Sequence, residues 1–425
     1  MTPAARLQAA IDILQELETT ALPADRYLRD WFRRRRYAGS KDRAAVAERV
    51  FDVLRHRGSF AWPMQSETPR AVVIGSLLHE RQTPDSVRAL FNGEGYGPSP
   101  LSESELNAMN SPPRGELPPH VKGEYPQWLE PELRRAFGGG LLDEMQALQS
   151  RASIDLRANA LKANRTEALK NLRVEGYDAQ ATPHSPLGIR IPAGASGLEK
   201  THAFASGAFE LQDEASQIAA LLVDAKPGMR VLDLAAGGGG KSLALASAMQ
   251  NEGEILAFDD NPARLKPLPE RAARAGATCI TIAETRGGPK WDDGKFDRVL
   301  MDAPCSGTGT WRRQPELRWR LKPERLEALE KTQAWLLEDG ARHTRPGGRL
   351  IYVTCSLLPS ENEDQIAAFL ERHSDFAICP ARDVWAEAIG TEPPPGVEQF
   401  FHATPLTFGT DGFFAAALAC RKHLS

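Results

Sequence analysis

Apolar residues in the first part of the chain recur every three or four positions, which is the spacing of one face of an α-helix. The recurring residues are Leu7, Ile11, Leu14 and Leu17, then Val46, Val50, Val53 and Leu54, then a stretch from Val72 to Leu78. No strand-like alternation of apolar and polar residues interrupts them. Because one-sided helices bury their apolar faces against one another, we predict a compact helical domain over residues 1–92.

Glycine, proline and serine are abundant in the next segment, residues 93–125. Such a segment has few apolar side chains to bury and is typical of a linker. A short pair of helices is expected from Pro126 to Gln149. Extended stretches near Ser153–Leu161 and Gly188–Pro192, with a helix at Arg165–Glu175 between them, complete a small α+β segment over residues 126–210.

Strand and helix patterns alternate in the last part of the chain, residues 211–425. After a helix at Asp213–Val223, the pattern runs Arg230–Leu234, Lys241–Met249, Glu254–Phe258, Ala263–Ala275, Thr278–Ile282, Phe296–Met301, Pro323–Thr344, Arg349–Val353 and Glu361–Arg372. This alternation predicts an α/β fold with a doubly wound parallel sheet. We expect a late strand at Gly412–Leu418.

Composition places the chain among ordinary globular proteins, with 41% hydrophobic and 25% charged residues and a net charge of -4. Its 425 residues fit two or three domains. No run of about twenty apolar residues predicts a membrane span, and Met1–Leu17 lacks the layout of a signal peptide. Five scattered cysteines favour a reducing cytoplasm and match no zinc site. We expect a cytoplasmic monomer without a metal ion.

Because the net charge is acidic, a nucleic-acid partner would have to bind at local basic patches. One candidate is Arg33–Arg36, flanked by Trp31, Phe32 and Tyr37. The other begins at Trp311, Arg312 and Arg313 and continues to Arg318, Trp319, Arg320 and Lys322. For the first patch a solvated helix face is an equally good interpretation. The second directly follows Cys305, which favours a functional role.

Two cysteines stand directly after predicted strands. One closes Val299-Leu300-Met301-Asp302-Ala303-Pro304-Cys305, and the other lies in Leu350-Ile351-Tyr352-Val353-Thr354-Cys355-Ser356. In an open α/β sheet, ligands bind at the carboxyl ends of the strands. Two thiols at that edge, one of them near Asp302, indicate covalent chemistry on an electrophilic carbon.

A glycine loop follows the strand at Arg230–Leu234. It reads Ala235-Ala236-Gly237-Gly238-Gly239-Gly240-Lys241-Ser242. Glycine has no Cβ, so a ligand can approach this backbone closely. The dinucleotide fingerprint fails, because its third glycine would fall on Ser242. The phosphate-binding loop is a near match, with Ala235 in place of the leading glycine and Asp302 as a possible magnesium ligand. A nucleotide hydrolase is therefore one alternative.

A third ligand class is S-adenosylmethionine, which Rossmann-like methyltransferases hold with such a loop. In these folds an acidic residue that ends the second strand binds the ribose hydroxyls. Asp259, at the end of Ile255-Leu256-Ala257-Phe258, supplies this acid. A carboxylate there would repel phosphates. Asp259 and Ala235 together therefore favour the methyl donor over a nucleotide phosphate.

These motifs form a set, and residues from about 126 to 420 resemble the RNA 5-methylcytosine methyltransferases of the RsmB/Nop/Sun family. The matching pieces are Arg157-Ala158-Asn159-Ala160-Leu161-Lys162, Gln212-Asp213-Glu214-Ala215-Ser216-Gln217, the glycine loop, Asp259, Asp302-Ala303-Pro304-Cys305-Ser306-Gly307, Thr354-Cys355-Ser356 and Asp411-Gly412-Phe413-Phe414. The helices before them, with Lys41-Asp42-Arg43 and Phe51-Asp52-Val53-Leu54, resemble a NusB-type RNA-binding domain.

The resemblance implies methylation of cytosine C5 through a covalent cysteine–C6 adduct. It makes Cys355 the nucleophile and gives Cys305 a role in product release. Asp302 would hold the cytosine N3/N4 edge, and Lys241 would line the base pocket. For the α+β segment it implies RNA binding, with Arg157, Asn159 and Lys162 as candidates beside Arg312 and Arg313.

The glycine loop and its surroundings depart from the family pattern. The family's loop usually carries a proline before its glycines, and here that proline is absent, which should loosen the loop. Glu284 stands where the family often has an aspartate near the adenine. Pro267 and Pro269 should kink or shorten the helix after Asp259.

The sequence therefore predicts an S-adenosylmethionine-dependent RNA methyltransferase, with ribosomal RNA favoured over transfer RNA as the substrate. Its cofactor-binding residues would be Ala235, Ala236, Gly237, Gly238, Gly239, Gly240, Lys241, Asp259, Glu284 and Asp302. Besides the nucleotide hydrolase, a second alternative is an RNA-binding protein in which the altered glycine loop has impaired catalysis. Such a protein would bind RNA in a salt-sensitive manner without affinity for the cofactor.

Overall fold

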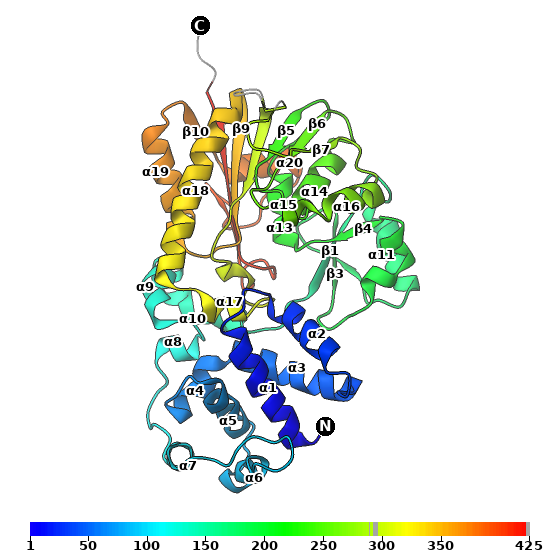
Figure 1. Ribbon diagram of the computed structural model, residues 1–425. Coiled ribbons are helices and arrows are strands. Elements are labelled where there is room, and N and C mark those ends of the chain that lie inside the picture. Colours follow the sequence, from blue (N-terminus) through cyan, green and yellow to red (C-terminus); the bar gives the residue numbers. More distant parts are fainter. Residues whose placement is uncertain (289, 292–295, 422–425) are drawn as a thin grey trace. The chain divides into compact units, whose positions relative to one another are not determined.

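The computed structural model describes residues 1–288, 290–291 and 296–421 (Figure 1). The chain divides into two compact units. The first, called here the helical unit, contains Met1–Ser150 together with Trp311–Leu321. The second, called here the sheet unit, contains Arg151–Thr310 and Lys322–Ser425.

The helical unit begins with a series of helices, of which the first, third and fifth are those that the apolar spacing predicts. Their bounds are α1 Pro3–Leu17, α2 Ala24–Arg34, α3 Ser40–Arg55, α4 Arg57–Met64, α5 Pro69–His79 and α6 Pro84–Leu90. Leu7, Ile11, Leu14 and Leu17 all lie in one hydrophobic core. Helix α1 starts sharply because the Thr2 hydroxyl accepts a hydrogen bond from the Ala5 amide and a proline occupies the first helical position.

The segment predicted as a linker, residues 93–125, carries two helices, α7 Glu103–Asn110 and α8 Pro119–Lys122. Met109 packs into the core of the helical unit. The buried Glu124 carboxylate accepts hydrogen bonds from the amides of Gly58 and Ser59, at 2.7 and 3.0 Å. Long-range contacts of this kind are invisible in local composition. Two further helices follow, α9 Glu130–Phe137 and α10 Leu141–Ala147, with the short 3₁₀ turns η1 Gln127–Leu129 and η2 Gly138–Gly140.

The sheet unit opens with a small antiparallel sheet of order β2-β3-β1-β4. Its strands are β1 Ile154–Ala158, β2 Gln180–Ala181, β3 Gly188–Ile191 and β4 Phe209–Leu211. Helices α11 Arg165–Val174 and α12 His202–Ala205 accompany them, and η3 Leu198–Lys200 precedes α12. Leu156, Leu172, Ile189 and Phe209 share its core. The predicted extended, helical and extended stretches are all present, and β2 and β4 are additional strands.

The large sheet has the strand order β10-β12-β9-β8-β5-β6-β7, with β11 paired to β12. The strands are β5 Arg230–Asp233, β6 Glu254–Ala257, β7 Ile280–Ile282, β8 Phe296–Asp302, β9 Thr344–Thr354, β10 Phe376–Cys379, β11 Phe401–Ala403 and β12 Phe413–Cys420. The five strands from β5 to β9 are parallel, whereas β12 is antiparallel to β9 and β10. The strand order reverses between β5 and β8, which places the ligand crevice at their carboxyl ends.

Helices cover both faces of this sheet, as its alternating side chains require. Val231 packs with α13 Glu214–Leu221, α14 Gly240–Ala248 and α20 Ala381–Ala388, whereas Leu232 packs with α18 Pro323–His343 and α19 Glu363–Arg372. Figure 1 shows the long α18 running along the sheet. The Rossmann-like α/β fold predicted from the sequence is confirmed.

The two prolines after Asp259 break the predicted helix, as expected, into α15 Pro262–Leu265 and α16 Leu268–Ala275. In the described part of the chain, no helix combines the length and the apolar character needed to cross a membrane.

Candidate active site

The glycine loop takes a backbone conformation that glycine adopts readily and other residues rarely adopt. Gly237 and Gly239 have φ angles of +52° and +80°, in the left-handed region. A Cβ on Gly239 would lie 2.2 Å from Leu268 Cδ1, so α16 packs directly against the loop backbone. The Ala236 amide donates to the Phe258 carbonyl at 2.8 Å, which joins the loop to the end of β6. The loop is therefore a tight turn closed against its neighbours.

Asp259 lies beside this loop, as predicted, and its side chain is buried. Its carboxylate accepts hydrogen bonds from the amides of Gly237 and Asn261, at 3.0 and 2.9 Å. Arg264 on α15 forms an ion pair with it at 3.1 Å. A fixed carboxylate beside the glycine loop suits a sugar with two hydroxyls, so these residues fit the adenosyl group of S-adenosylmethionine.

Arg271 supplies a constraint on the loop that the sequence did not indicate. Its Nη1 donates to the Gly238 carbonyl at 2.6 Å, and its Nη2 donates to Glu210 at 2.9 Å. Arg274 also pairs with the buried Glu210 carboxylate. The missing proline was expected to leave the loop loose, but here a charge-assisted hydrogen bond from α16, fixed in turn by β4, ties the loop down.

Lys241 and Ser242, the residues that favoured a nucleotide hydrolase, both contact carboxylates. Lys241 Nζ donates to Asp302 Oδ2 and Ser242 Oγ donates to Asp233 Oδ2, each at 2.6 Å. Burial raises the pKa of Asp233 to about 7. With Asp259 and Asp302 beside it, this loop would repel a polyphosphate. The arrangement does not support the nucleotide hydrolase.

The two predicted thiols meet at the carboxyl ends of β8 and β9. Because Asp302 pairs with Val353 in the parallel register, the loops that follow both strands start level with each other. Cys305 Sγ and Cys355 Sγ lie 3.4 Å apart, within hydrogen-bonding distance for sulfur. The hydrogen bond to Cys355, followed by burial, raises the pKa of Cys305 well above its usual value. Cys305 therefore keeps its proton at neutral pH and can donate it to the neighbouring sulfur.

Glu361 joins the two cysteine loops, and no motif in the sequence indicated it. Its carboxylate is fully buried and accepts hydrogen bonds from the Ser306 amide, at 2.8 Å, and from the hydroxyls of Ser306 and Ser356. Gln333 Nε2 on α18 donates to it at 2.9 Å. Glu361 thus fixes the residue after each thiol. Glu361 ends the 3₁₀ turn η5 Pro359–Glu361, and a lone glutamate there carries no local signal, so only the three-dimensional structure reveals it.

Asn362 and Thr308 complete this connection. Asn362 accepts a hydrogen bond from the Thr354 hydroxyl at 2.6 Å and donates to the Ser356 carbonyl at 3.0 Å. The Thr308 hydroxyl accepts from the Leu357 amide at 2.8 Å. Because polar groups in a buried hydrogen-bond network hold one another in place, this network positions the two loops that carry the sulfur atoms.

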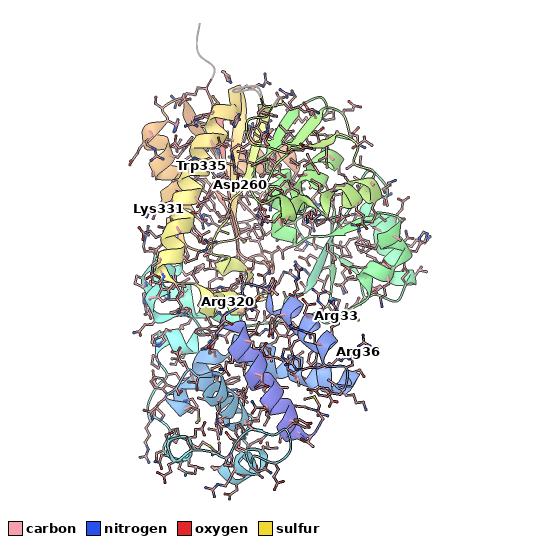
Figure 2. All side chains as sticks on the ribbon, in the orientation of Figure 1. Arg33, Arg36, Asp260, Arg320, Lys331 and Trp335 are labelled. Atoms are coloured by element: carbon pink, nitrogen blue, oxygen red, sulfur yellow. The ribbon has the colours of Figure 1, made fainter. Side chains whose placement is uncertain are left out.

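Glu284, the candidate adenine contact, is exposed. Its neighbour Arg286 is the more constrained residue at the end of β7. Arg286 Nη2 donates to Asp260 at 2.8 Å, and its guanidinium lies 4.7 Å from the Phe258 ring and 4.5 Å from the Trp335 ring. Figure 2 labels Asp260 and Trp335. The charged and aromatic cluster at this strand end therefore includes Arg286, which the sequence analysis missed.

Arg157 and Asn159, predicted to contact RNA, lie inside the fold instead. Burial lowers the pKa of Arg157 to about 10, and its Nε donates to Gln212 at 2.6 Å. Asn159 Nδ2 donates to the carbonyls of Gly207 and Ala275, both at 2.8 Å. These residues join the small sheet to its surroundings. Lys162 alone of the three is exposed, with its stem over Gly276.

Arg312 and Arg313 belong to the helical unit, in the inserted segment 311–321 that contains α17 Glu316–Arg320. Arg312 is buried and Arg313 is exposed. The aromatic residues near them are not free to stack on a base, because Trp311 is fully buried and Trp319 Nε1 donates to the Leu54 carbonyl at 2.7 Å. Of the two arginines predicted to bind RNA, Arg313 alone is accessible. Among the described residues, no cluster of histidine, cysteine and carboxylate side chains suits a metal ion.

Two family models match this chain. The ferredoxin-like domain of RsmF/B-like methyltransferases matches residues 125–196, and the 16S rRNA methyltransferase RsmB/F matches residues 220–419. The second match spans the glycine loop, Asp259 and both thiols. The first covers the small antiparallel sheet as far as β3.

Curated relatives agree with these models. The probable ribosomal RNA small subunit methyltransferase B of Bacillus subtilis is 32% identical over 303 residues, 69% of this chain and 66% of that protein. The ribosomal RNA small subunit methyltransferase B of Pseudomonas syringae pv. tomato is 35% identical over 308 residues, 71% of this chain and 67% of that protein. The matches thus span about two thirds of these relatives.

A solved structure resembles almost the whole chain. The crystal structure of PH0851 has a TM-score of 0.77 at 26% identity, and the match covers 98% of this chain and 99% of that one. Family models, curated relatives and fold point the same way. The chain belongs to the RsmB/F methyltransferase family.

Proposed function

We propose that this protein methylates C5 of a cytosine in the RNA of the small ribosomal subunit, with Cys355 as the covalent nucleophile. The observation that carries the proposal is the pair of sulfur atoms, 3.4 Å apart, at the carboxyl ends of β8 and β9, where Asp302 and Lys241 also meet. The names of the curated relatives support ribosomal RNA as the substrate.

The glycine loop and Asp259 would hold S-adenosylmethionine, which would supply an electrophilic methyl group. The Cys355 thiolate adds to C6 of the cytosine, and the new sulfur–carbon bond makes C5 nucleophilic. Asp302, already paired with Lys241, would hold the N3/N4 edge of the base. Since a site that pairs with these groups leaves its own atoms unpaired against uracil, the same contacts favour cytosine.

Release of the product requires loss of the C5 proton, after which the sulfur–carbon bond breaks and its electron pair returns to Cys355. Cys305 is suited to this step. The largest influence that raises the pKa of Cys305 is its hydrogen bond to Cys355. When Cys355 is bonded to the cytosine, that influence falls, so Cys305 can release its own proton to solvent and then accept the C5 proton as a thiolate.

The two cysteine variants test the proposal by their opposite effects. Cys305→Ser is expected to trap a protein–RNA adduct that survives denaturing electrophoresis, when the protein is incubated with transcribed small-subunit ribosomal RNA and S-adenosylmethionine. Cys355→Ser is expected to give neither adduct nor methyl transfer. The matched control is Cys379→Ser on β10, which should methylate as the parent does. Methyl transfer by the Cys355→Ser protein would refute the nucleophile assignment.

A further inference from the structure

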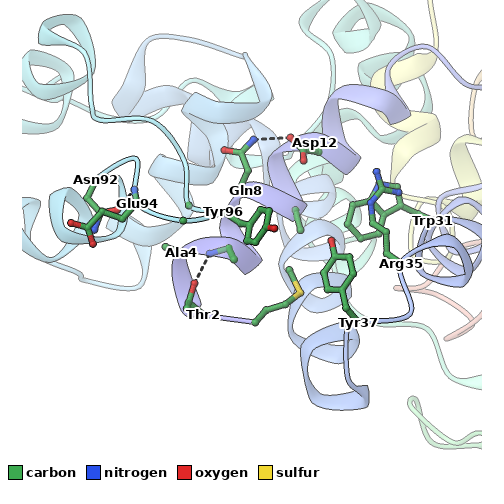
Figure 3. Close-up of a pocket in the computed structure, with 15 residues that line it drawn as sticks. Thr2, Ala4, Gln8, Asp12, Trp31, Arg35, Tyr37, Asn92, Glu94 and Tyr96 are labelled. Atoms are coloured by element: carbon green, nitrogen blue, oxygen red, sulfur yellow. Dashed lines mark hydrogen bonds between the residues drawn. The ribbon is translucent and has the colours of Figure 1, made fainter.

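The helical unit contains a surface groove of about 980 Å³ that the proposed catalytic site does not use (Figure 3). We call it the aromatic groove. It lies between α1, the end of α2 and the loop at residues 92–97. The residues that matter to its chemistry are Trp31, Arg35, Tyr37, Asn92 and Tyr96.

Tyr37 and Tyr96 are the two most exposed aromatic side chains in the described chain, at 72% and 89%. Both line the aromatic groove, and Figure 3 shows Tyr96 entering it from the loop and Tyr37 from the opposite side. Single exposed apolar side chains are common on protein surfaces, whereas apolar groups gathered in one groove are typical of a binding site. Two of them facing one groove offer flat surfaces on which planar groups can stack.

Arg35 adds a third flat surface. Its guanidinium carbon lies 3.8 Å above the centre of the buried Trp31 ring, so the guanidinium plane is held in place at the groove wall. Nucleic-acid bases stack on guanidinium planes as they do on aromatic rings. Asp12 and Glu94, which also line the groove, are acceptors for base amino groups and would repel phosphates from its interior.

Positive charge lies next to the groove rather than within it. Arg33, Arg34 and Arg36 are all exposed around the end of α2, and Figure 2 shows Arg33 and Arg36 there. Arg33 is paired with Asp30 at 3.0 Å. A strand whose bases enter the groove would place its phosphates beside these arginines. Stacking surfaces with a flanking basic track are the physical requirements of a single-stranded nucleic-acid site.

We propose that the aromatic groove binds a single-stranded segment of the RNA substrate, with bases stacked on Tyr37, Tyr96 and Arg35 and phosphates along Arg34 and Arg36. The inference rests on the proposed function, because it takes the substrate to be RNA. It adds a second binding site, separate from the cytosine pocket, that selects unpaired RNA over duplex RNA.

The test measures binding of a short fluorescein-labelled oligoadenylate to the full-length protein by fluorescence anisotropy. Tyr37→Ala and Tyr96→Ala are each expected to weaken binding at least about fivefold, since a stacked base contributes about 1 kcal/mol or more. Tyr37→Phe and Tyr96→Phe keep the ring and should bind within about twofold of the parent. Both tyrosines are exposed, so the alanine variants are expected to fold.

A second measurement separates this proposal from the catalytic one. In methyl-transfer assays the alanine variants should raise the KM for RNA and leave kcat unchanged. Alanine variants that bind oligoadenylate as tightly as the parent would overturn the groove proposal, even if methylation is normal. Tyrosine-dependent binding without any methyl transfer by the parent would instead refute the proposed function. Photo-crosslinks from 4-thiouridine RNA that fall only outside the groove would also overturn the proposal and leave the groove to a protein partner.

Discussion

Two segments of the helical unit combine arginine with aromatic residues but expose their side chains to different degrees. Around the end of α2, Arg33, Arg34 and Arg36 reach solvent. In the inserted segment 311–321, by contrast, Trp311 and Arg318 are fully buried. Arg318 donates to the Arg55 carbonyl at 3.1 Å, and burial lowers its pKa to about 10.

The difference shows that a run of arginines can hold a fold together as well as bind a ligand. Side chains of the inserted segment form hydrogen bonds with backbone groups at or near helix ends. Arg320 donates to the carbonyls of Leu17 and Leu22, and Glu316 accepts from the Ala24 amide at 2.9 Å. Helix ends carry unsatisfied carbonyl and amide groups, and long charged side chains satisfy them. Near Tyr37, the side chains of Arg34 and Arg36 are exposed and therefore accessible to a partner.

The largest expected effect comes from removing the fully buried tryptophan of the inserted segment. Trp311→Ala should lower the free energy of unfolding by about 3–5 kcal/mol, because it leaves a cavity where a large side chain was packed. The matched variant Tyr37→Ala removes an exposed ring and should change stability by less than about 0.5 kcal/mol. Denaturant unfolding of both proteins checks this. Equal destabilisation of the two variants would show that the segments do not differ as described.

A smaller effect concerns the exposed arginines. The double variant Arg34→Ala, Arg36→Ala should weaken RNA binding uniformly across sequences. The slope of log affinity against log salt should fall by about 0.7 for each phosphate that the variant no longer neutralises. Titrations of oligoadenylate at several salt concentrations measure the slope. An unchanged slope would mean that these side chains, like those of the inserted segment, do not bind phosphate.

The smallest effect is a pH dependence that accompanies the buried segment. Burial raises the pKa of Glu124, while the nearby Arg318 charge lowers it only in part. A carboxyl whose folded pKa is raised stabilises the fold most below its unfolded pKa, and this stability is lost as pH rises through the folded value. Relative to Glu124→Gln, the parent should therefore lose unfolding free energy above about pH 4.5, by less than about 1.4 kcal/mol per pH unit. A gain in stability with pH would contradict this prediction.

Much of the fold could be predicted from the sequence, because periodicity reports which face of an element is buried. The helices α1, α3 and α5 and the strands β5, β6, β8 and β9 follow their patterns closely. The prediction differed from the structure where distant residues decide the outcome. Residues 93–125 have the composition of a linker, yet Met109 and Glu124 attach them to the helical unit. The apolar residues of β12 also gave no indication that this strand runs antiparallel to β9.

The candidate site divides in the same way. Motif spacing was enough to predict one common edge of the sheet for the glycine loop, Asp259, Asp302, Cys305 and Cys355, since parallel strands end at a common edge. The positioning residues Arg271, Arg286 and Glu361 were not predicted, because each contacts residues that are distant in the sequence. A lone arginine or glutamate also forms no recognisable motif. Arg157 and Asn159 were assigned to RNA on their chemistry, but burial gives them partners within the protein.

The sequence by itself determined which chemical groups are present and on which strands and loops they lie, because both depend on local spacing and residue type. Tertiary structure alone decided which of those groups meet one another and which meet solvent. Cys305 and Cys355 come within 3.4 Å through the register of β8 and β9 and the hydrogen bonds that both cysteine loops make to Glu361. Exposure of Tyr37 and burial of Trp311 have the same origin: packing between segments far apart in the chain decides how much of each side chain reaches solvent.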